Sequence, residues 1–500
     1  MENYFKSNRQ SKNKQTVFII WLVCLLLHVS FNALAQNPVI SFTKEGEREK
    51  ELITQETKVQ LLECKNMLNY PKSVERFYKD NAYQLAWVTK LNHNRQLAPA
   101  MLILDCVKQF GLNQDNFHGN NLLYKQIEVL AEEPEMLSGG QRAIFDVLMT
   151  DAMITFMNHL HYGKFNTAFT PTIIDEGKSG DFNAVLKLAK LMESKDFYNE
   201  IAGVQPSSKE YDDLQKYMHL VRGQYLEDSY EFPEKSVRKM TINMERLRWT
   251  VNNQSSSLTI NIPAQMAKLN LGDSVYLFPA VVGQASSPTP TLESFITHFT
   301  TAPEWKVPHH IFVNELLPKA IKNASYLRNN HFTIYDAKGN FVALSTKKLQ
   351  YIRAHPKNYY ARQSSGCDHP MGNLVFQFEN PYQVILHDTP QLKLFRSKNR
   401  ASSQNCIRVE KAEKLVALIL AADGSKAKIL PMRKAIAAYQ KKDFVLKTPF
   451  PLLVNYITCE MIDSQLMIYP DLYLQDRALE MAMYGYERLL ASDLKISSKL

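Results

Sequence analysis

The pattern of apolar and polar positions changes near the middle of the chain. Between about residues 58 and 220, apolar residues recur every three or four positions, as in SVERFYKDNAYQLAW and GGQRAIFDVLMTDAMITFMNHLHYG. This spacing predicts a domain of amphipathic helices. Between about residues 257 and 462, the apolar runs are short or alternating and are bounded by Gly, Pro, Asn and Asp. These runs predict strands, so we expect a multidomain α+β fold in which an α-helical domain precedes a mostly β domain.

The N-terminal residues have the pattern of an export signal. Residues 1–35 contain a basic stretch, an apolar run from Thr16 to Ser30 and the small-x-small sequence Ala33-Leu34-Ala35. A run of this length fits a signal peptide better than a bilayer span. We therefore expect export with cleavage of residues 1–35, and an uncleaved membrane anchor is the alternative.

The segments that flank the two domains lack clear periodicity. Residues 36–57 are polar and predict a flexible lead-in. Residues 221–256, which contain Pro233, predict a linker. Residues 308–369 are rich in Lys, Arg and His and interrupt the β domain, so we expect an irregular insertion that caps the site. Residues 463–500 predict a helical C-terminal tail.

Charge and cysteine usage narrow the class of protein. The formal net charge is +9, but the basic residues are scattered, which does not indicate a nucleic-acid-binding protein. Outside the predicted signal peptide, five cysteines remain: Cys64, Cys106, Cys367, Cys406 and Cys459. Their wide spacings indicate neither a zinc site nor a disulfide scaffold. We expect no metal and no cofactor.

One stretch of the β domain combines a strand, a basic loop and a cysteine. The predicted strand ends at His387, and Cys406 follows nineteen positions later. An imidazole can take the proton of a thiol, and the thiolate can then attack a carbonyl carbon. Residues 409–422 predict a helix directly after Cys406, so we expect the helix dipole to stabilise its thiolate. We expect Cys367 not to be the nucleophile, and Cys459 to lie in the core.

The residues around this pair resemble a known signature. The segments are His387-Asp388-Thr389-Pro390, then Arg400, then Ser403-Gln404-Asn405-Cys406-Ile407-Arg408-Val409. They are similar to the active-site signature of the L,D-transpeptidases, cysteine enzymes of the YkuD fold that cross-link peptidoglycan. Further segments resemble the large periplasmic subfamily, which has an N-terminal helical scaffold domain. In this sequence Gln404 stands where the family usually has His, and Asn405 stands where it usually has Gly. Asn tolerates positive φ best after Gly.

The resemblance implies a set of roles. Cys406 is expected to be the nucleophile, His387 the base, and Asn405 a donor of its backbone N–H to the oxyanion. The residues expected to contact substrate are Arg400, Ser403, Arg408, Tyr382 and Gly372. Arg400 could instead fix the loop, and Arg408 could be a buried staple. The histidines of the expected cap, namely His309, His310, His355 and His369, are expected at the surface.

The resemblance also implies substrates and a location. Peptidoglycan stem peptides would be donor and acceptor in 3–3 cross-linking, and carbapenem-type compounds would be inhibitors. The protein would act in the periplasm, with inner-membrane association through its N-terminal segment as an option. Two alternatives stay open at this point. One is an L,D-carboxypeptidase that trims stems with water as the acceptor, and the other is a non-catalytic protein that binds or organises the wall.

Overall fold

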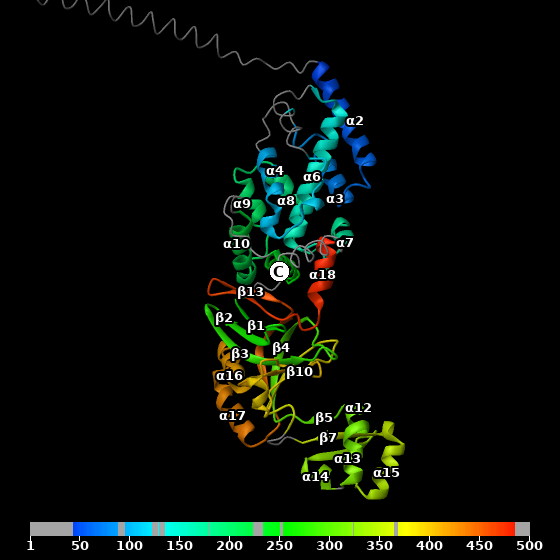
Figure 1. Ribbon diagram of the computed structural model, residues 1–500, viewed down its shortest axis with the longest axis vertical. Helices are drawn as coiled ribbons and strands as arrows, with labels where there is room; N and C mark the ends of the chain where they lie inside the picture. Colours follow the sequence, from blue (N-terminus) through cyan, green and yellow to red (C-terminus); the bar gives the residue numbers. More distant parts are fainter. Residues whose placement is uncertain are drawn as a thin grey trace, which may run out of the picture. The chain divides into compact units, whose positions relative to one another are not determined.

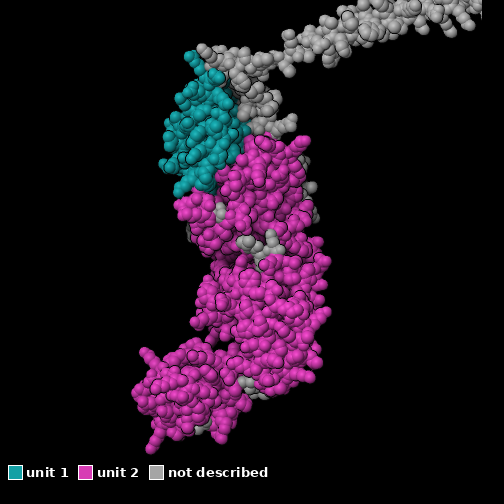
Figure 2. All heavy atoms as spheres, turned by 180° about the vertical axis from the view of Figure 1, so that it is seen from behind, with its two compact units in different colours: residues 1–94, 121–150 teal, residues 95–120, 151–500 magenta. Residues whose placement is uncertain are grey.

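The computed structural model describes residues 44–88, 96–122, 129, 136–178, 180–223, 234–250, 254–323, 325–364 and 369–485 (Figure 1). Residues 1–94 and 121–150 form one compact unit, and residues 95–120 and 151–500 form a second (Figure 2). The expected signal peptide and Cys367 lie outside the described residues. Among the described helices, none combines the length and apolar character needed to cross a bilayer.

The first unit is organised around a buried carboxylate. It contains α2 (Lys44–Glu63), α3 (Pro71–Asp80) and the first part of α6 (Gly139–His161). Asp146 on α6 accepts hydrogen bonds from the backbone N–H groups of Ala86, Trp87 and Val88. The hydroxyl of Tyr78 on α3 donates to the same carboxylate. These bonds satisfy backbone N–H groups after α3 that are not part of a helix or strand.

The expected flexible lead-in is wrong for residues 44–57, because α2 begins at Lys44. The segment is densely charged and carries few apolar residues, so its sequence has no helical periodicity. Tertiary contacts order it nevertheless: Thr57 is fully buried and Leu61 is nearly so. Most helical stability in proteins comes from such packing rather than from intrinsic propensity.

The second unit continues the helical region, as the sequence predicts. Besides the second part of α6, its helices up to residue 223 include α4 (Leu97–Asp105), the short η1 (Val107–Phe110) and η2 (Gln114–Asn116), α7 (Pro171–Asp175), α8 (Ala184–Leu191), α9 (Phe197–Ala202) and α10 (Lys209–Gly223). Polar side chains cap several of them. The Asn183 side chain, for example, accepts from the N–H groups of Val185 and Leu186 at the start of α8, which satisfies donors that an N-terminus leaves unpaired.

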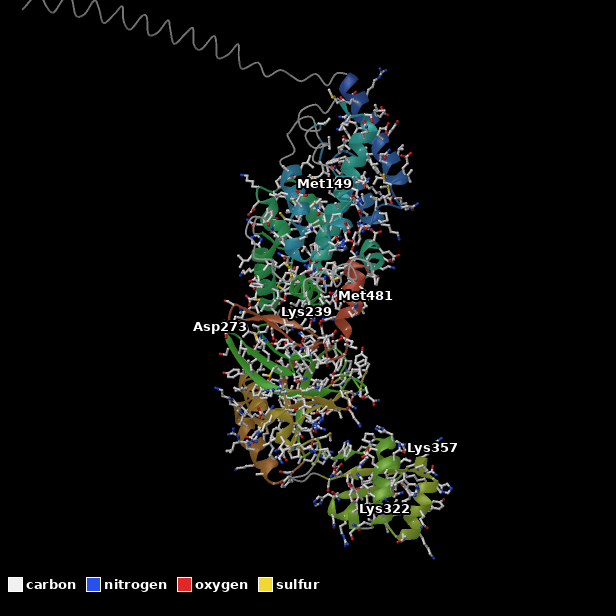
Figure 3. The ribbon with its side chains drawn as sticks, viewed as in Figure 1. Met149, Lys239, Asp273, Lys322, Lys357 and Met481 are labelled. Carbon is white, nitrogen blue, oxygen red and sulfur yellow. The ribbon has the colours of Figure 1, made fainter. Side chains whose placement is uncertain are left out.

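The central part of the expected linker is instead a buried helix, α11 (Glu234–Arg248). Its apolar residues recur at helical spacing and share a core with α10 and β13: Val237, Met240, Met244 and Leu247. The C-terminal helix α18 (Gln475–Tyr484) docks against α11 through buried charges. Asp476 of α18 binds both Lys239 and Arg246 of α11. Lys239 and Met481, labelled in Figure 3, mark the two helices.

The β domain is built on a sheet that closes on itself. Its strands are β1 (Ser256–Asn261), β2 (Met266–Leu271), β3 (Ser274–Gly283), β4 (Leu292–Thr301), β8 (Leu374–Phe378), β9 (Leu386–His387), β10 (Ala401–Ser403), β11 (Ile407–Val409) and β12 (Lys442–Asn455). They hydrogen-bond in the order β10-β3-β11-β9-β8-β4-β12-β1-β2, and β2 also pairs with β3. This last pairing closes a ring of strands, which removes the open edges of the sheet. A hairpin of β13 (Cys459–Ile462) and β14 (Gln465–Ile468) lies outside the sheet.

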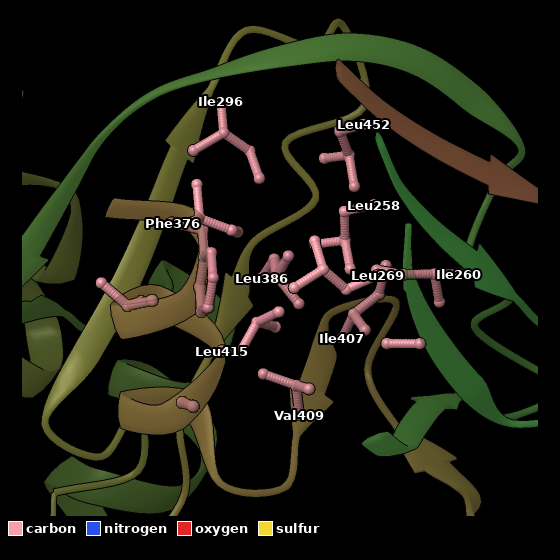
Figure 4. Close-up of a cluster of buried hydrophobic side chains, with 14 of the residues drawn as sticks. Leu258, Ile260, Leu269, Ile296, Phe376, Leu386, Ile407, Val409, Leu415 and Leu452 are labelled. Atoms are coloured by element: carbon pink, nitrogen blue, oxygen red, sulfur yellow. The ribbon is translucent and has the colours of Figure 1, made fainter. Parts of the chain in front are cut away.

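Alternate residues of the strands fill a single apolar core. Leu386 of β9, Ile407 and Val409 of β11, and Phe376 of β8 all point into it (Figure 4). Helix α16 (Ala412–Ala422) adds Leu415 and neighbouring apolar residues to the same core, and α17 (Ile429–Ala437) packs beside it. Each fully buried side chain of this size contributes roughly 1.5–3 kcal/mol. The core therefore fixes which residues of β9 and β11 face outward.

The expected cap insertion is an ordered subdomain rather than an irregular loop. We call residues 305–363 the insert. It contains β5 (Trp305–Lys306), α12 (His309–Ile311), η4 (Phe312–Leu316), α13 (Leu317–Lys322), α14 (Ser325–Asn329), β6 (Phe332–Asp336), α15 (Thr346–Ala354), η5 (Pro356–Asn358) and β7 (Tyr359–Gln363). Its strands form a separate sheet in the order β5-β7-β6. Its own core includes Phe312, Leu317, Ile334, Ile352 and Ala361.

Candidate active site

The register of β9 and β11 brings the predicted pair onto one face. The two strands are parallel neighbours, and Ile407 is aligned with Leu386 while Arg408 is aligned with His387. Side chains alternate along a strand. Because Leu386 and Ile407 point into the core, His387, Arg408 and the preceding Cys406 face the opposite side. The sheet therefore places the thiol, imidazole and guanidinium groups on the same side, facing away from the apolar core.

His387 is a buried, neutral imidazole. Only 4% of its surface is exposed, and its Nδ1 lies 2.5 Å from the backbone oxygen of Asp388. A carbonyl oxygen only accepts, so Nδ1 carries the hydrogen and the lone pair is on Nε2. Burial lowers the pKa of His387 to about 4, and the positive charge of Arg408 acts in the same direction, while the carbonyls of Asp388 and Met371 oppose it. The ring is thus free to accept a proton at neutral pH.

Cys406 is a protonated thiol in the resting site. Burial raises its pKa, and the backbone N–H contact with Ile385 and the Arg408 charge only partly compensate. Its Sγ donates to Oδ1 of Asn405 at 3.5 Å. The expected stabilisation by a helix dipole is wrong, because strand β11 follows Cys406 and α16 begins only at Ala412. A buried thiol without that help needs a base to become a nucleophile.

The backbone around Cys406 is held in a tight loop. Asn405 has φ 55°, the left-handed conformation that Gly would adopt most easily. Its N–H donates to the Ser287 oxygen at 3.2 Å, and its carbonyl accepts from the Thr289 hydroxyl at 2.8 Å. The N–H of Cys406 donates to the Gln404 oxygen at 2.7 Å. The oxyanion role of the Asn405 N–H stays a prediction, and it requires that this amide exchange the Ser287 oxygen for the substrate.

Two of the expected substrate contacts are instead parts of the loop. Ser403 is 3% exposed, and its hydroxyl donates to the carbonyl oxygen of Cys406. Arg400 donates from its side chain to the backbone oxygens of Gln265 and Ala280 at 2.8 and 3.2 Å. For Arg400, the structure thus favours the loop-fixing alternative. The sequence alone does not distinguish these loop contacts from substrate contacts, because both residues belong to the motif that contains Cys406.

Arg408 lies where it can act on both reacting groups. It lowers the pKa of Cys406 and of His387 through its charge, and its Nη1 donates to the Gln391 side chain at 3.2 Å. Its Nε is buried and makes no hydrogen bond. A buried donor without an acceptor is costly, so this atom is available to a substrate oxygen. The structure accommodates both sequence hypotheses, staple and substrate contact.

Gly372 and Tyr382, both expected to contact substrate, lie in turns on either side of β8. Gly372 has φ 59°, and a Cβ at this position would lie 2.6 Å from Oδ2 of Asp388. It therefore allows the turn before β8 to pack against the residue that follows His387. Tyr382 is 52% exposed in the turn between β8 and β9, where it remains open to a ligand.

His369 is a residue of this region that the sequence analysis placed at the surface. It is 1% exposed, and neither ring nitrogen makes a hydrogen bond. Its charged form would lower the pKa of His387, so the two rings are close. Its carbonyl accepts from the N–H of Gly372 at 2.8 Å, in the same turn. No periodic pattern marks it, and burial of a loop histidine depends on contacts that the sequence does not reveal.

The described residues contain no cluster of three or more His, Cys, Asp or Glu side chains that could hold a metal ion. The groups that the site brings together are the thiol, the imidazole and the guanidinium. Together they can move a proton from Cys406 to His387 and stabilise the thiolate beside Arg408.

Two regions of the chain match known protein domains. Residues 72–218 match the model of a scaffold domain, and residues 255–430 match the model of the L,D-transpeptidase catalytic domain. A Haemophilus influenzae protein named "Putative L,D-transpeptidase" is 28% identical over 255 residues. That match spans half of this chain and half of the relative. The two matched regions together cover most of the chain, which thus combines a region similar to this scaffold domain with a region similar to the L,D-transpeptidase catalytic domain of the YkuD type.

Proposed function

We propose that this protein is an L,D-transpeptidase that forms 3–3 cross-links between peptidoglycan stems. The observation that carries the proposal is that His387 ends β9 while Cys406 directly precedes the adjacent parallel strand β11, both facing away from the core within the matched catalytic domain. We further propose that it acts in the periplasm, because its N-terminal residues have the pattern of an export signal.

The first half of the reaction forms a thioester. Nε2 of His387 takes the Cys406 proton, and the thiolate attacks the carbonyl carbon before the terminal D-residue of a tetrapeptide stem. The oxyanion is stabilised by backbone N–H groups of the loop, with Asn405 as the proposed donor. The C–N bond then breaks, and the imidazolium returns its proton to the departing amine. Arg408 stabilises negative charge on sulfur throughout.

The second half transfers the acyl group to an amine. A side-chain amine of a second stem attacks the thioester carbonyl and gives its proton to His387. The C–S bond breaks, the new amide forms, and the proton returns to the Cys406 sulfur. If water replaced the amine, the same steps would release a shortened stem, which is the carboxypeptidase reaction.

Product analysis tests the proposal. Purified protein is incubated with a disaccharide-tetrapeptide, and the products are resolved by mass. We expect a cross-linked dimer with loss of one terminal D-residue. Tripeptide alone would identify a carboxypeptidase.

Acylation by a carbapenem tests for catalysis itself. We expect one carbapenem adduct on the wild-type protein and on Cys459→Ala, and none on Cys406→Ala. Absence of both adduct and products from a folded wild-type protein would leave the non-catalytic alternative.

A further inference from the structure

The positive charge of the chain is concentrated in the insert. Residues 305–363 contain ten Lys and Arg against two Asp and Glu, a net charge of +8, whereas the whole chain has +9. Two of these cations, Lys322 and Lys357, are labelled on the insert in Figure 3 and are exposed. The rest of the protein is therefore almost neutral, so the electrostatic attraction for an anionic partner comes from this subdomain.

The sheet of the insert has two chemically different faces. The helices of the insert pack with Ile334 and Ala361, which are register partners on β6 and β7. Because side chains alternate, the next residues point to the opposite face. On that face Tyr335 is aligned with Tyr360, and Arg362 is aligned with Lys306 of β5. We call Lys306, Tyr335, Phe341, Tyr360 and Arg362 the basic aromatic face.

The aromatic residues of this face form a row. Tyr335 and Tyr360 are stacked, with ring centroids 5.6 Å apart and an interplanar angle of 18°. Phe341 forms a bridge with Tyr335 on the other side and therefore extends the row on the same face. Phe341 is 68% exposed. An aromatic side chain this exposed, next to other rings, marks an interaction surface more often than a stability feature.

Cationic side chains lie over these rings, and most of their positive charge is not neutralised by a neighbour. Arg362 lies 5.2 and 5.4 Å from the centroids of Tyr335 and Tyr360, and Lys306 lies 4.8 Å from Tyr360. The Arg362 side chain is 42% exposed, and its acidic neighbour Glu304 is 3.8 Å away and itself exposed. One exposed carboxylate at this distance offsets little of the local positive charge. A ligand carboxylate can therefore bind Arg362 beside the rings.

These features specify a partner with both flat apolar faces and carboxylates. Sugar rings present C–H faces that stack on aromatic rings, and peptide stems present carboxylates. A glycan strand that carries peptide stems offers both at regular intervals. We propose that the basic aromatic face is a docking site for the peptidoglycan polymer, separate from the thiol site. The identity of this polymer rests on the proposed function, whereas the face itself does not.

A sedimentation assay tests the proposal. Cys406→Ala protein, which cannot turn over its substrate, is mixed with purified insoluble peptidoglycan. The test variant adds Lys306→Glu and Arg362→Glu. The matched control adds Lys426→Glu and Lys434→Glu, which make the same charge change at exposed positions outside the insert. We expect the test variant to bind at least tenfold more weakly and the control to bind within twofold of the parent. Equal binding by the test variant and the parent would overturn the proposal.

A second variant tests the contribution of the aromatic row to binding without changing the charge or the stability of the protein. Phe341→Ser removes an exposed ring, so the melting temperature should not change. We expect binding at least threefold weaker, and unchanged binding would contradict the role of the aromatic row. Salt should weaken binding of the parent. If the face variants instead lose binding to anionic lipid vesicles or single-stranded DNA while peptidoglycan binding is unaffected, the face serves a different partner.

Activity on a small substrate distinguishes this inference from the proposed function. In the background with Cys406 intact, the Lys306→Glu/Arg362→Glu variant should process a soluble disaccharide-tetrapeptide within twofold of wild type. A parallel loss of this activity would assign the face to the catalytic pocket and overturn a separate docking site. If wild type processes no stem peptide but binds peptidoglycan through this face, the proposed function fails and the docking site stands.

Discussion

Gly372 lies against Asp388 so closely that no other residue fits between them. A Cβ at position 372 would be 2.6 Å from Oδ2 of Asp388 and 2.7 Å from its backbone carbonyl carbon. The same carboxylate accepts the N–H of Asn373 at 2.9 Å. The turn before β8 is thereby fixed to the residue that follows His387, and the carbonyl of Met371 in this turn faces the His387 ring.

We expect Gly372→Ala to destabilise the protein strongly. Positive φ alone costs about 1 kcal/mol for Ala, and the clash with Asp388 adds a similar or larger cost, so the total is about 2–4 kcal/mol. Urea unfolding measures the change. Gly272→Ala is the matched control, because Gly272 also has positive φ but nothing lies within 4 Å of its Cβ position. Equal costs for the two variants would show that the contact with Asp388 is unimportant.

The pH dependence of catalysis should reflect the burial of His387. Burial lowers the pKa of His387 to about 4. The imidazole therefore stays neutral, and can act as a base, at pH values well below the ordinary pKa of 6.5. The pKa of the Cys406 thiol is raised by burial, so the thiol needs the imidazole to take its proton across this pH range. We expect the rate of carbapenem acylation to stay flat from neutral pH to about pH 5 and to halve near pH 4. An acid limb near pH 6.5 would contradict this reading.

Arg408→Gln provides the control for this profile. Loss of the cation should raise the pKa of His387, which moves the acid limb to higher pH, and should also raise the pKa of Cys406. The protonation of His387 also affects the stability of the fold. Its pKa is lower in the folded chain than in the unfolded chain, so the unfolded chain binds the proton more tightly. The contribution of neutral His387 is therefore complete above pH 6.5 and is lost as the pH falls through about 4. An unchanged acid limb in Arg408→Gln would show that its charge does not reach the ring.

The two sulfurs, Cys406 and Cys459, should respond differently to substitution by Ala. Cys406 is half-buried at the outer face, so Cys406→Ala should change stability by no more than about 1 kcal/mol while abolishing acylation. Cys459 is fully buried, and burial raises its pKa to about 12. Cys459→Ala should keep acylation and cost about 1–2 kcal/mol. Intact mass and thermal unfolding measure both effects, and a large loss of stability in Cys406→Ala would mark Cys406 as a core residue.

Asp476 should be essential for docking of the C-terminal helix. Lys239 and Arg246 both bind this carboxylate, and the Thr458 hydroxyl donates to it at 2.9 Å. Burial raises the pKa of Asp476, but these partners outweigh it and the net shift is downward. Asp476→Ala leaves Arg246 buried and unpaired, which costs about 3–5 kcal/mol. We expect earlier proteolysis within α18, whereas Asp273→Ala, at an exposed position in the turn between β2 and β3, should have no effect.

The sequence predicted the fold class and the placement of His387 near Cys406, because both depend on local patterns. The strand that ends at His387 and the short run after Cys406 alternate as strands do, and their spacing lets them pair. By contrast, α11 was read as a linker because its charged residues outnumber its apolar ones, although Val237, Met240 and Met244 have helical spacing. Its burial depends on α10, β13 and α18, and the last two lie more than 200 residues away in the sequence.

The failures at the site have the same origin. Ser403 and Arg400 belong to the motif, but their hydrogen bonds go to the loop and to β3, and only tertiary structure reveals these partners. No sequence pattern indicates that His369 is buried, because a histidine in a polar stretch is usually exposed. Its burial results from the turn at Gly372, whose need for glycine comes from Asp388, sixteen positions later.

Asn405 tests whether the departure from the family signature changes the site. Asn405→Gly keeps the backbone at φ 55° without strain, and it removes only the Oδ1 that accepts from the thiol. We expect acylation to be retained or to increase, because a thiol freed from Asn405 can turn to His387. Asn405→Ala removes the same acceptor but places a Cβ in the left-handed region, at a cost of about 1–2 kcal/mol. It should lose stability and at least tenfold in acylation rate, since Cys406 follows directly. Thermal unfolding and the carbapenem acylation rate compare the three proteins. Complete loss of activity in Asn405→Gly, with the fold intact, would show that the Asn405 side chain itself takes part in the reaction.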